Sequence, residues 1–217
     1  MSTSSILFIS LILAAYVTPF GNALSYRYFG YGSNVLVSTM KALRQIQPLD
    51  ATAAVLPDYE LKFDGSSNSR IEPSAAFVNP AKGKQVHGVL YTLSEQDFAK
   101  VGRTEGVPFA YRWQKSKVYP YIGNGNQAGK EAMESSAEPV LDAYVLISPK
   151  NLDDRDNIPP SSSYLGLIKE GAAKWKFDES YQQELASVEE AKNLIIPQGL
   201  SGLVLKVAEA ATGTKRE

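Results

Sequence analysis

Cysteine is absent from this 217-residue chain, and histidine occurs once, as His87. Without cysteine the chain can form no disulfide framework, thiolate nucleophile or cysteine-ligated metal site. A zinc site would depend on carboxylates and one imidazole, which is an uncommon set of ligands. A Ser-His-Asp triad would need His87 as its base, but this residue lies in the strand-like run Val-His-Gly-Val-Leu-Tyr. We therefore interpret His87 as a half-exposed structural residue and assign it no chemistry.

The chain also lacks an excess of charge of either sign, since its formal net charge is −1. A protein that binds nucleic acid or an anionic membrane surface usually carries clustered positive charge. The hydrophobic share of 44% and the charged share of 21% are ordinary for a globular protein. We therefore expect no nucleic-acid partner, and instead a small molecule or another protein. The oligomeric state, a homodimer included, stays open.

Charged side chains are missing from the start of the chain, where the first is Arg27. Ile6–Phe20 is apolar apart from Ser10 and Thr18, and the small residues Ala23 and Ser25 suit a cleavage site. This pattern predicts a secretory signal peptide over residues 1–25, too short to span a membrane comfortably, followed by one domain over residues 26–217. We expect a secreted or lumenal protein without a stable membrane anchor after cleavage. A basic n-region is missing, so an uncleaved anchor or a bipartite organellar leader is the alternative.

The rest of the chain mixes short strand patterns with few helices. Ser94 is expected to cap a short helix over Asp97–Val101, and a polar loop over Gly123–Pro139 is expected to join two strands as a hairpin. Helical spacing continues in the last third, at Tyr164–Lys174 and Glu179–Asn193. The predicted strands are Ala53–Phe63, Ala75–Val78, Val86–Leu93, Tyr111–Ile122 and Val140–Ile147. This order predicts an α+β fold with a mixed, mostly antiparallel sheet.

The most informative segment is residues 26–34, Tyr-Arg-Tyr-Phe-Gly-Tyr-Gly-Ser-Asn. Its aromatic residues suit a half-buried strand, and Gly30 and Gly32 permit a tight turn. Ser33 and Asn34 are good N-cap residues for a helix over Val35–Arg44. Such a turn presents backbone N–H groups that can bind an anion or an oxyanion. An ordinary connection between a strand and a helix is the alternative.

Three segments together resemble the γ-glutamylcyclotransferase family. Residues 28–34 resemble its substrate loop, Tyr-Phe-x-Tyr-Gly-Ser-Asn, and Glu105-Gly106-Val107 with Tyr111 resembles the segment that carries its catalytic glutamate. The segment Pro-Pro-Ser-Ser-Ser-Tyr at residues 159–164, with Gly171, Ala172, Tyr181 and Leu185 after it, resembles its C-terminal signature. The three occur in the family's order and cover most of residues 26–190.

The resemblance implies a β-barrel with flanking helices and a reaction inside one small molecule. The α-amine of a γ-glutamyl group attacks its own side-chain carbonyl, which yields 5-oxoproline and a free amino acid without a metal or other cofactor. Glu105 would be the general acid and base. Tyr111 and Tyr144 match aromatic positions near the site, or else belong to the core. The substrate-binding residues implied are Tyr28, Phe29, Gly30, Tyr31, Gly32, Ser33, Asn34 and Tyr164.

Two details of the resemblance bear on substrate and activity. Tyr-Gly-Ser-Asn is similar to the branch acting on γ-glutamyl amino acids, whereas the glutathione-specific branch more often has Tyr-Gly-Ser-Leu. The family often has acidic residues shortly before its glutamate, but Gly102, Arg103 and Thr104 stand there in this chain, and Arg103 is near enough in sequence to act on Glu105. A non-catalytic module that binds a small amide and a glutathione-specific enzyme are the alternative functions.

Overall fold

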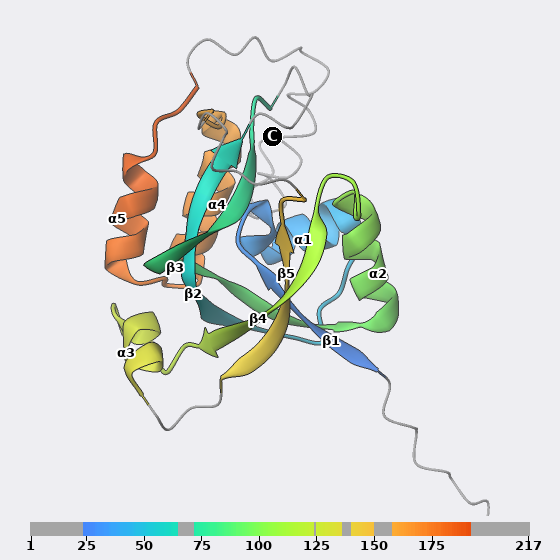
Figure 1. The fold of residues 1–217 in the computed structure, drawn as a ribbon, viewed down its shortest axis with the longest axis horizontal. Coiled ribbons are helices and arrows are strands. Elements are labelled where there is room, and N and C mark those ends of the chain that lie inside the picture. Colours follow the sequence, from blue (N-terminus) through green and yellow to red (C-terminus); the bar gives the residue numbers. More distant parts are fainter. Residues whose placement is uncertain (1–23, 65–71, 124, 136–139, 150–157, 192–217) are drawn as a thin grey trace, which may run out of the picture.

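The computed structural model describes residues 24–64, 72–123, 125–135, 140–149 and 158–191. Five strands in these ranges close into a barrel in the order β1-β3-β2-β4-β5 (Figure 1). Strands β1 and β5 pair in parallel, and the other neighbours pair antiparallel. The strands are β1 (Ser25–Gly30), β2 (Asp50–Asp64), β3 (Ala75–Ser94), β4 (Arg112–Pro120) and β5 (Leu141–Ile147). The predicted fold, a mixed and mostly antiparallel barrel with flanking helices, is confirmed.

Strand β3 joins two strands that the sequence predicted to be separate, Ala75–Val78 and Val86–Leu93. Pro80 and Gly83 between them look like turn residues in the sequence. In the structure the pairing with β2 holds on both sides of this stretch, with Tyr59 opposite Pro80 and Pro57 opposite Gln85, across a register shift between Pro57 and Tyr59. The shift accommodates the irregular residues without ending the strand, as a β-bulge does.

Five α-helices and one 3-10 turn occur in the described ranges. In Figure 1, α2 lies on one side of the barrel, and α4 and α5 lie on the other. The helix bounds are α1 (Val37–Arg44), α2 (Glu95–Thr104), α3 (Ala128–Glu134), α4 (Ser162–Lys174) and α5 (Glu179–Ser187), with the 3-10 turn η1 at Ser33–Val35. Helix α3 lies in the segment predicted as a polar loop, and α5 ends six residues before the predicted Asn193. No helix in the described part of the chain is both long and apolar enough to cross a bilayer.

Ser94 caps α2 as predicted, since its hydroxyl accepts a hydrogen bond from the backbone N–H of Asp97 at 3.1 Å. The helix is longer than predicted at both ends. Its C-terminal extension places Glu105 at the C-cap. The predicted signal peptide falls almost wholly outside the described residues, so the leader and the location of the protein stay predictions.

The barrel core fixes the strand that leads into the candidate site. Phe29 of β1 is fully buried, and Gly88 of β3 lies against it. A Cβ atom at Gly88 would lie 2.5 Å from the carbonyl oxygen of Gly30 and 2.5 Å from Cζ of Phe29. Because a backbone atom cannot move aside easily, Gly88→Ala should lower the free energy of unfolding by about 1–3 kcal/mol. Urea unfolding measures the loss.

Gly166→Ala is the matched control for this prediction. Gly166 is exposed on α4, and nothing lies within 4 Å of a Cβ built there. Alanine is a better helix former than glycine, so this variant should gain about 0.5–1 kcal/mol. Equal effects of the two substitutions would show that Gly88 is not a point of close approach.

Candidate active site

The turn after β1 does not begin a helix as the sequence predicted. Ser33 and Asn34 were expected to cap a helix over Val35–Arg44, but they form the 3-10 turn η1, and α1 begins only at Val37. The N-cap of α1 is Leu36, and no side chain caps either element. The capping prediction is therefore wrong. The physical reason is that the side chain of Asn34 is directed into a pocket, where stronger partners bind it.

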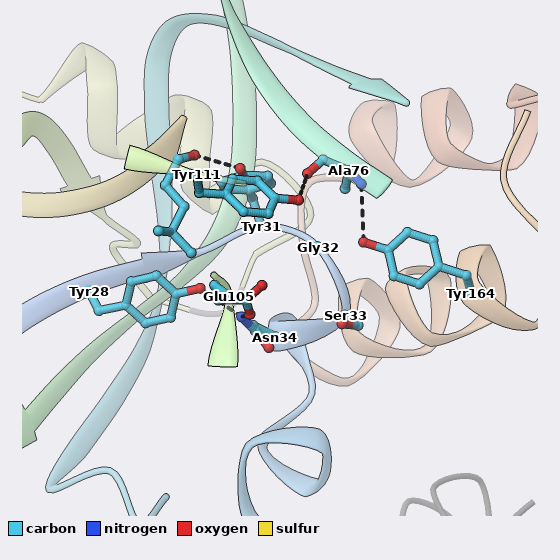
Figure 2. A pocket seen from close by; sticks show the side chains of 10 residues that line it. Tyr28, Tyr31, Gly32, Ser33, Asn34, Ala76, Glu105, Tyr111 and Tyr164 are labelled. Atoms are coloured by element: carbon cyan, nitrogen blue, oxygen red, sulfur yellow. Dashed lines mark hydrogen bonds between the residues drawn. The ribbon is translucent and has the colours of Figure 1, made fainter. Parts of the chain in front are cut away.

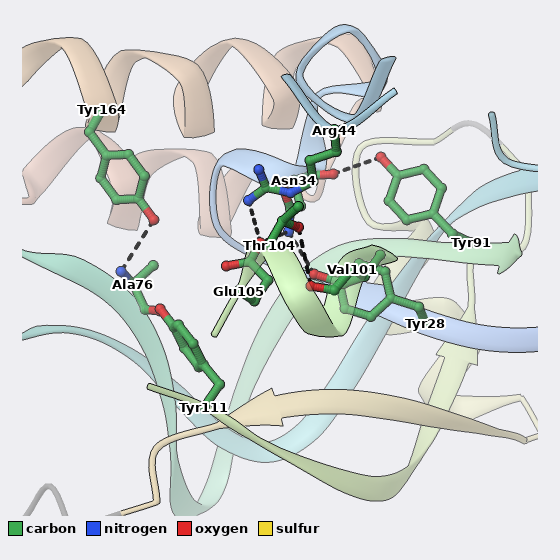
Figure 3. A network of polar contacts seen from close by, with 10 residues as sticks. All are labelled: Tyr28, Asn34, Arg44, Ala76, Tyr91, Val101, Thr104, Glu105, Tyr111 and Tyr164. Atoms are coloured by element: carbon green, nitrogen blue, oxygen red, sulfur yellow. Dashed lines mark hydrogen bonds and ion pairs between the residues drawn. The ribbon is translucent and has the colours of Figure 1, made fainter. Parts of the chain in front are cut away.

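Asn34 is held in place from three directions. Its Nδ2 donates hydrogen bonds to the hydroxyl of Tyr28 and to Oε1 of Glu105, each at 2.7 Å. Its backbone carbonyl accepts a hydrogen bond from the hydroxyl of Tyr91 at 2.7 Å (Figure 3). These contacts join β1, β3 and α2 at one residue of the turn. They fix the turn against Glu105, which follows Asn34 by 71 positions.

Glu105 is presented by the end of a helix. It is the C-cap of α2, and its backbone N–H donates to the carbonyl of Val101 at 2.9 Å. Gly106 follows in a left-handed conformation, with φ of 72°, and turns the chain away. The side chain of Glu105 is 14% exposed. It thus points into the molecule from a rigid position.

The carboxylate of Glu105 binds an arginine that the sequence did not indicate. Arg44, the last residue of α1, forms an ion pair with Oε1 of Glu105, the oxygen that also accepts from Asn34. Arg103, which the sequence suggested for this contact, is exposed and is not the cation that pairs with Glu105 in the described part of the chain. The signal for Arg44 was weak but present, because it is the only arginine on the helix that starts from the turn.

The second carboxylate oxygen of Glu105, Oε2, differs from Oε1 in its hydrogen bonds. Both hydrogen bonds to the side chain go to Oε1. Within the described ranges, no group donates to Oε2. This oxygen can therefore accept a hydrogen bond from a ligand without loss of an existing contact.

Four tyrosines surround the pocket with their hydroxyl groups (Figure 2). Tyr31 donates to the carbonyl of Leu146 at 2.5 Å, and Tyr111 donates to the carbonyl of Ala76 at 3.0 Å. The hydroxyl of Tyr164, from α4, accepts from the backbone N–H of Ala76 at 3.2 Å. The fourth, Tyr28, accepts from Asn34.

These hydroxyls are neutral at physiological pH. Burial is the main cause of a raised pKa at all four tyrosines, to about 12 for Tyr164 and well above the ordinary value for Tyr31 and Tyr111. At Tyr28 the negative charge of Glu105 adds to the effect of burial and raises the pKa further. The tyrosines can therefore donate hydrogen bonds but cannot act as bases. Among the described residues that line this pocket, Glu105 is the only acidic one.

The pocket has an inner and an outer part. The inner pocket, of about 30 Å³, is lined by Tyr28, Tyr31, Gly32, Ser33, Asn34, Ala76, Glu105, Tyr111, Leu146 and Tyr164. The outer hollow, of about 300 Å³, is lined by Ser33, Arg44, Glu72, Ser74, Ala75, Phe77, Glu105, Ala110, Tyr111 and Tyr164. Since Glu105 lines both, it lies at the boundary between them.

The structure brings together most of the residues that the sequence singled out. Tyr28, the turn from Tyr31 to Asn34, Glu105 and Tyr164 all line the inner pocket, as does Tyr111. Phe29 and Gly30 do not, because Phe29 is buried in the core and Gly30 ends β1. Tyr144 is also outside the pocket and packs on Phe98, with ring centroids 5.0 Å apart. Within the described ranges, no group of three His, Asp or Glu side chains is arranged to hold a metal ion.

Comparison with known proteins finds one family. A sequence model of the family described as "Gamma-glutamyl cyclotransferase, AIG2-like" matches residues 28–165, more than half of the chain. The "Gamma-glutamyl cyclotransferase gliK" of Claviceps purpurea (strain 20.1) is 28% identical over 149 residues, which are 66% of this chain and 61% of the fungal protein. The "Gamma-glutamylcyclotransferase" of Mus musculus is 26% identical over 168 residues, which are 76% of this chain and 79% of the mouse protein.

A solved structure has the same fold as this chain. A protein named "Gamma-glutamyl cyclotransferase" superposes on this chain with a TM-score of 0.64 at 21% identity. The match covers 84% of this chain and 99% of that protein. At this level of identity the likeness establishes a shared architecture, the closed barrel described above.

Proposed function

This chain belongs to the gamma-glutamyl cyclotransferase, AIG2-like family, and from this premise we propose that it converts γ-glutamyl amino acids into 5-oxoproline and a free amino acid. One observation supports the proposal above all. Glu105 and the turn at Gly32–Asn34, distant in the sequence, line one pocket and are joined by the hydrogen bond between Asn34 Nδ2 and Glu105 Oε1.

The proposed reaction needs a folded substrate and one proton carrier. The α-nitrogen attacks the γ-carbonyl carbon of the same molecule, the new C–N bond closes the ring, and the amide bond to the leaving amine breaks. Two protons leave the α-ammonium group over the reaction, and both end on the leaving amine. A single carboxylate can carry them one at a time. In this proposal Glu105 does so through Oε2, since the hydrogen bonds from Asn34 and Arg44 go to Oε1. Holding both reacting atoms close supplies much of the remaining acceleration.

The turn supplies the groups that bind negative charge in this proposal. Backbone N–H groups of the turn would bind the α-carboxylate of the substrate and the oxygen of the attacked carbonyl. Gly32 is suited to this role because a Cβ there would lie 3.0 Å from the hydroxyl of Tyr164 and crowd the pocket. The neutral tyrosine hydroxyls complete a polar lining that does not compete with Glu105 for protons.

A direct assay tests the proposal. The purified protein is incubated with γ-glutamyl-alanine and, separately, with glutathione, and 5-oxoproline is measured by mass spectrometry. We expect product from γ-glutamyl-alanine at a rate well above that with heat-denatured protein. Binding of the dipeptide without product would support the non-catalytic module, and turnover of glutathione alone would support the glutathione-specific enzyme.

A further inference from the structure

Among the described residues, Arg44 is the cation that lines the outer hollow, and it is already paired with the proposed base. Arg44 lines the outer hollow but not the inner pocket, whereas Glu105 lines both. The ion pair between them therefore crosses the boundary between the two spaces (Figure 3). Because only 15% of the Arg44 side chain is exposed, water solvates its charge poorly.

The other charge in the outer hollow is occupied elsewhere. Glu72 accepts hydrogen bonds from the backbone N–H of Ser161 at 2.9 Å and from the Ser161 hydroxyl. Ser161 is the N-cap of α4, so the negative charge of Glu72 lies against the positive end of a 13-residue helix. Glu72 is thus bound to the fold, which leaves the ion pair of Arg44 and Glu105 as the described charges of the hollow that can meet a ligand.

Two polar atoms in the same lining have no hydrogen-bond partner among the described residues. They are Oγ of Ser74 and Nε of Arg44, and both atoms are buried. Ser74 itself is fully buried. A buried donor without a partner costs free energy, and a ligand that supplies an acceptor recovers it. A guanidinium group and a hydroxyl group together suit a carboxylate.

We propose that the outer hollow binds the carboxylate of the leaving amino acid, with Arg44 as its principal partner and Ser74 as a second donor. The inference rests on the proposed function, and it names the class of leaving group. Substrates whose leaving group is an amino acid are preferred over γ-glutamyl amides that lack this carboxylate. Arg44 is then the residue that sets specificity.

Proton transfer removes the anion of the ion pair. In the free protein Arg44 and Glu105 neutralise each other. When Glu105 takes a proton from the α-ammonium group of the substrate through Oε2, the carboxyl group becomes neutral and Arg44 loses its anion. A carboxylate on the leaving group restores the balance at Arg44, whereas a neutral alkyl group leaves a largely buried cation unpaired. Proton transfer therefore favours a substrate with a carboxylate on its leaving group.

A pair of substrates that differ by one carboxylate tests this. γ-Glutamyl-ethylamide is γ-glutamyl-alanine without the carboxylate of alanine. We expect the wild-type protein to have a kcat/KM about 100-fold higher for the dipeptide. Arg44→Gln should abolish most of this preference, because it lowers kcat/KM for the dipeptide much more than for the ethylamide. Ser74→Ala should reduce the preference by about 2- to 10-fold.

Arg103→Gln is the matched control, because Arg103 is near Glu105 in sequence but exposed and not its ion-pair partner. It should keep the preference intact, and thermal unfolding should show that Arg44→Gln is folded. Equal loss on both substrates in Arg44→Gln, or no preference in the wild-type protein, would overturn the inference while the proposed function stands.

A binding measurement separates the two proposals. Calorimetry with Glu105→Gln compares the affinity of the dipeptide and the ethylamide without turnover. Discrimination of about tenfold or more that is lost in the Glu105→Gln, Arg44→Gln double variant supports the carboxylate site even if the wild-type protein forms no 5-oxoproline. Turnover without discrimination refutes the carboxylate site alone. If neither the dipeptide nor the ethylamide binds, both proposals are refuted.

Discussion

Glu105→Gln is expected to lower kcat for the formation of 5-oxoproline by about 10²- to 10⁴-fold, the range over which a positioned acid or base accelerates a reaction. Glutamine has nearly the same shape, and its carbonyl oxygen can still accept from Asn34 and Arg44, which now bind Glu105 Oε1. The variant should therefore keep the fold and the pocket. What it loses is the capacity to take a proton from the substrate and return it to the leaving nitrogen.

The control for this prediction is Glu95→Gln, on the same helix. Glu95 is exposed in the first turn of α2, at the opposite end from Glu105. It should retain the wild-type rate, and the unfolding temperatures of the two variants should be similar. A rate for Glu105→Gln within tenfold of the wild-type rate would exclude Glu105 as the proton carrier.

Acidification is expected to destabilise the protein through His87, a residue that the sequence led us to interpret wrongly as half exposed. His87 is fully buried between the sheet and α5, with its ring centroid 4.5 Å from that of Tyr181. Its Nδ1 contacts the hydroxyl of Tyr121, whose oxygen accepts from the backbone N–H of Asp178 at 3.0 Å. Both contacts hold the ring edge that carries Nδ1 against Tyr121.

The neutral ring is the form that this site accommodates. Nε2 is buried and has no hydrogen-bond partner among the described residues, so a second ring proton would have no acceptor there. Burial lowers the pKa of His87 from 6.5 to about 4, and the charge of Asp178 opposes this only in part. Protonation in the folded state is thus disfavoured, whereas the unfolded chain takes up the proton at its ordinary pKa.

The direction of the pH effect follows from these two pKa values. Between pH 6.5 and about 4 the unfolded chain binds more protons than the folded protein, so stability falls as the pH falls through this window. The contribution is fully present above pH 6.5. Its loss is about 2 kcal/mol by pH 5 and about 3 kcal/mol once the folded protein is protonated too.

Urea unfolding of the wild-type protein and of His87→Gln, at pH 7 and at pH 5, measures this contribution. Glutamine does not titrate, so the variant should be less stable at pH 7 but should lose about 2 kcal/mol less on acidification. The comparison between proteins cancels the titration of the carboxylates, which both share. An equal loss in the two proteins would show that His87 does not contribute to acid sensitivity.

Local sequence patterns indicated those parts of the site that are formed by neighbouring residues in the chain. The aromatic strand before Gly30 and the turn at Tyr31–Asn34 follow from side-chain spacing and glycine. The role of Glu105 came only from the family resemblance, because a loop glutamate among many acidic residues carries no local signal. The structure shows that the turn and Glu105 lie side by side, since Asn34 and Glu105 are hydrogen-bonded.

The errors have a common physical cause, which is that tertiary contacts override local preference. Asn34 has the capacity to cap a helix but donates to Tyr28 and Glu105 instead. The residues around Pro80 and Gly83 look like a turn but continue β3, because β2 pairs with β3 on both sides of them. Arg44 was missed, since its partner lies 61 positions away and its place on the helix after the turn is only a weak signal.

A crystal structure of Glu105→Gln with γ-glutamyl-alanine bound tests the central claim most directly. The account predicts that the γ-glutamyl group occupies the inner pocket, with its α-amine facing residue 105 and the oxygen of its γ-carbonyl on the backbone N–H groups of the turn. A dipeptide bound elsewhere, or bound with its α-amine directed away from residue 105, would contradict it.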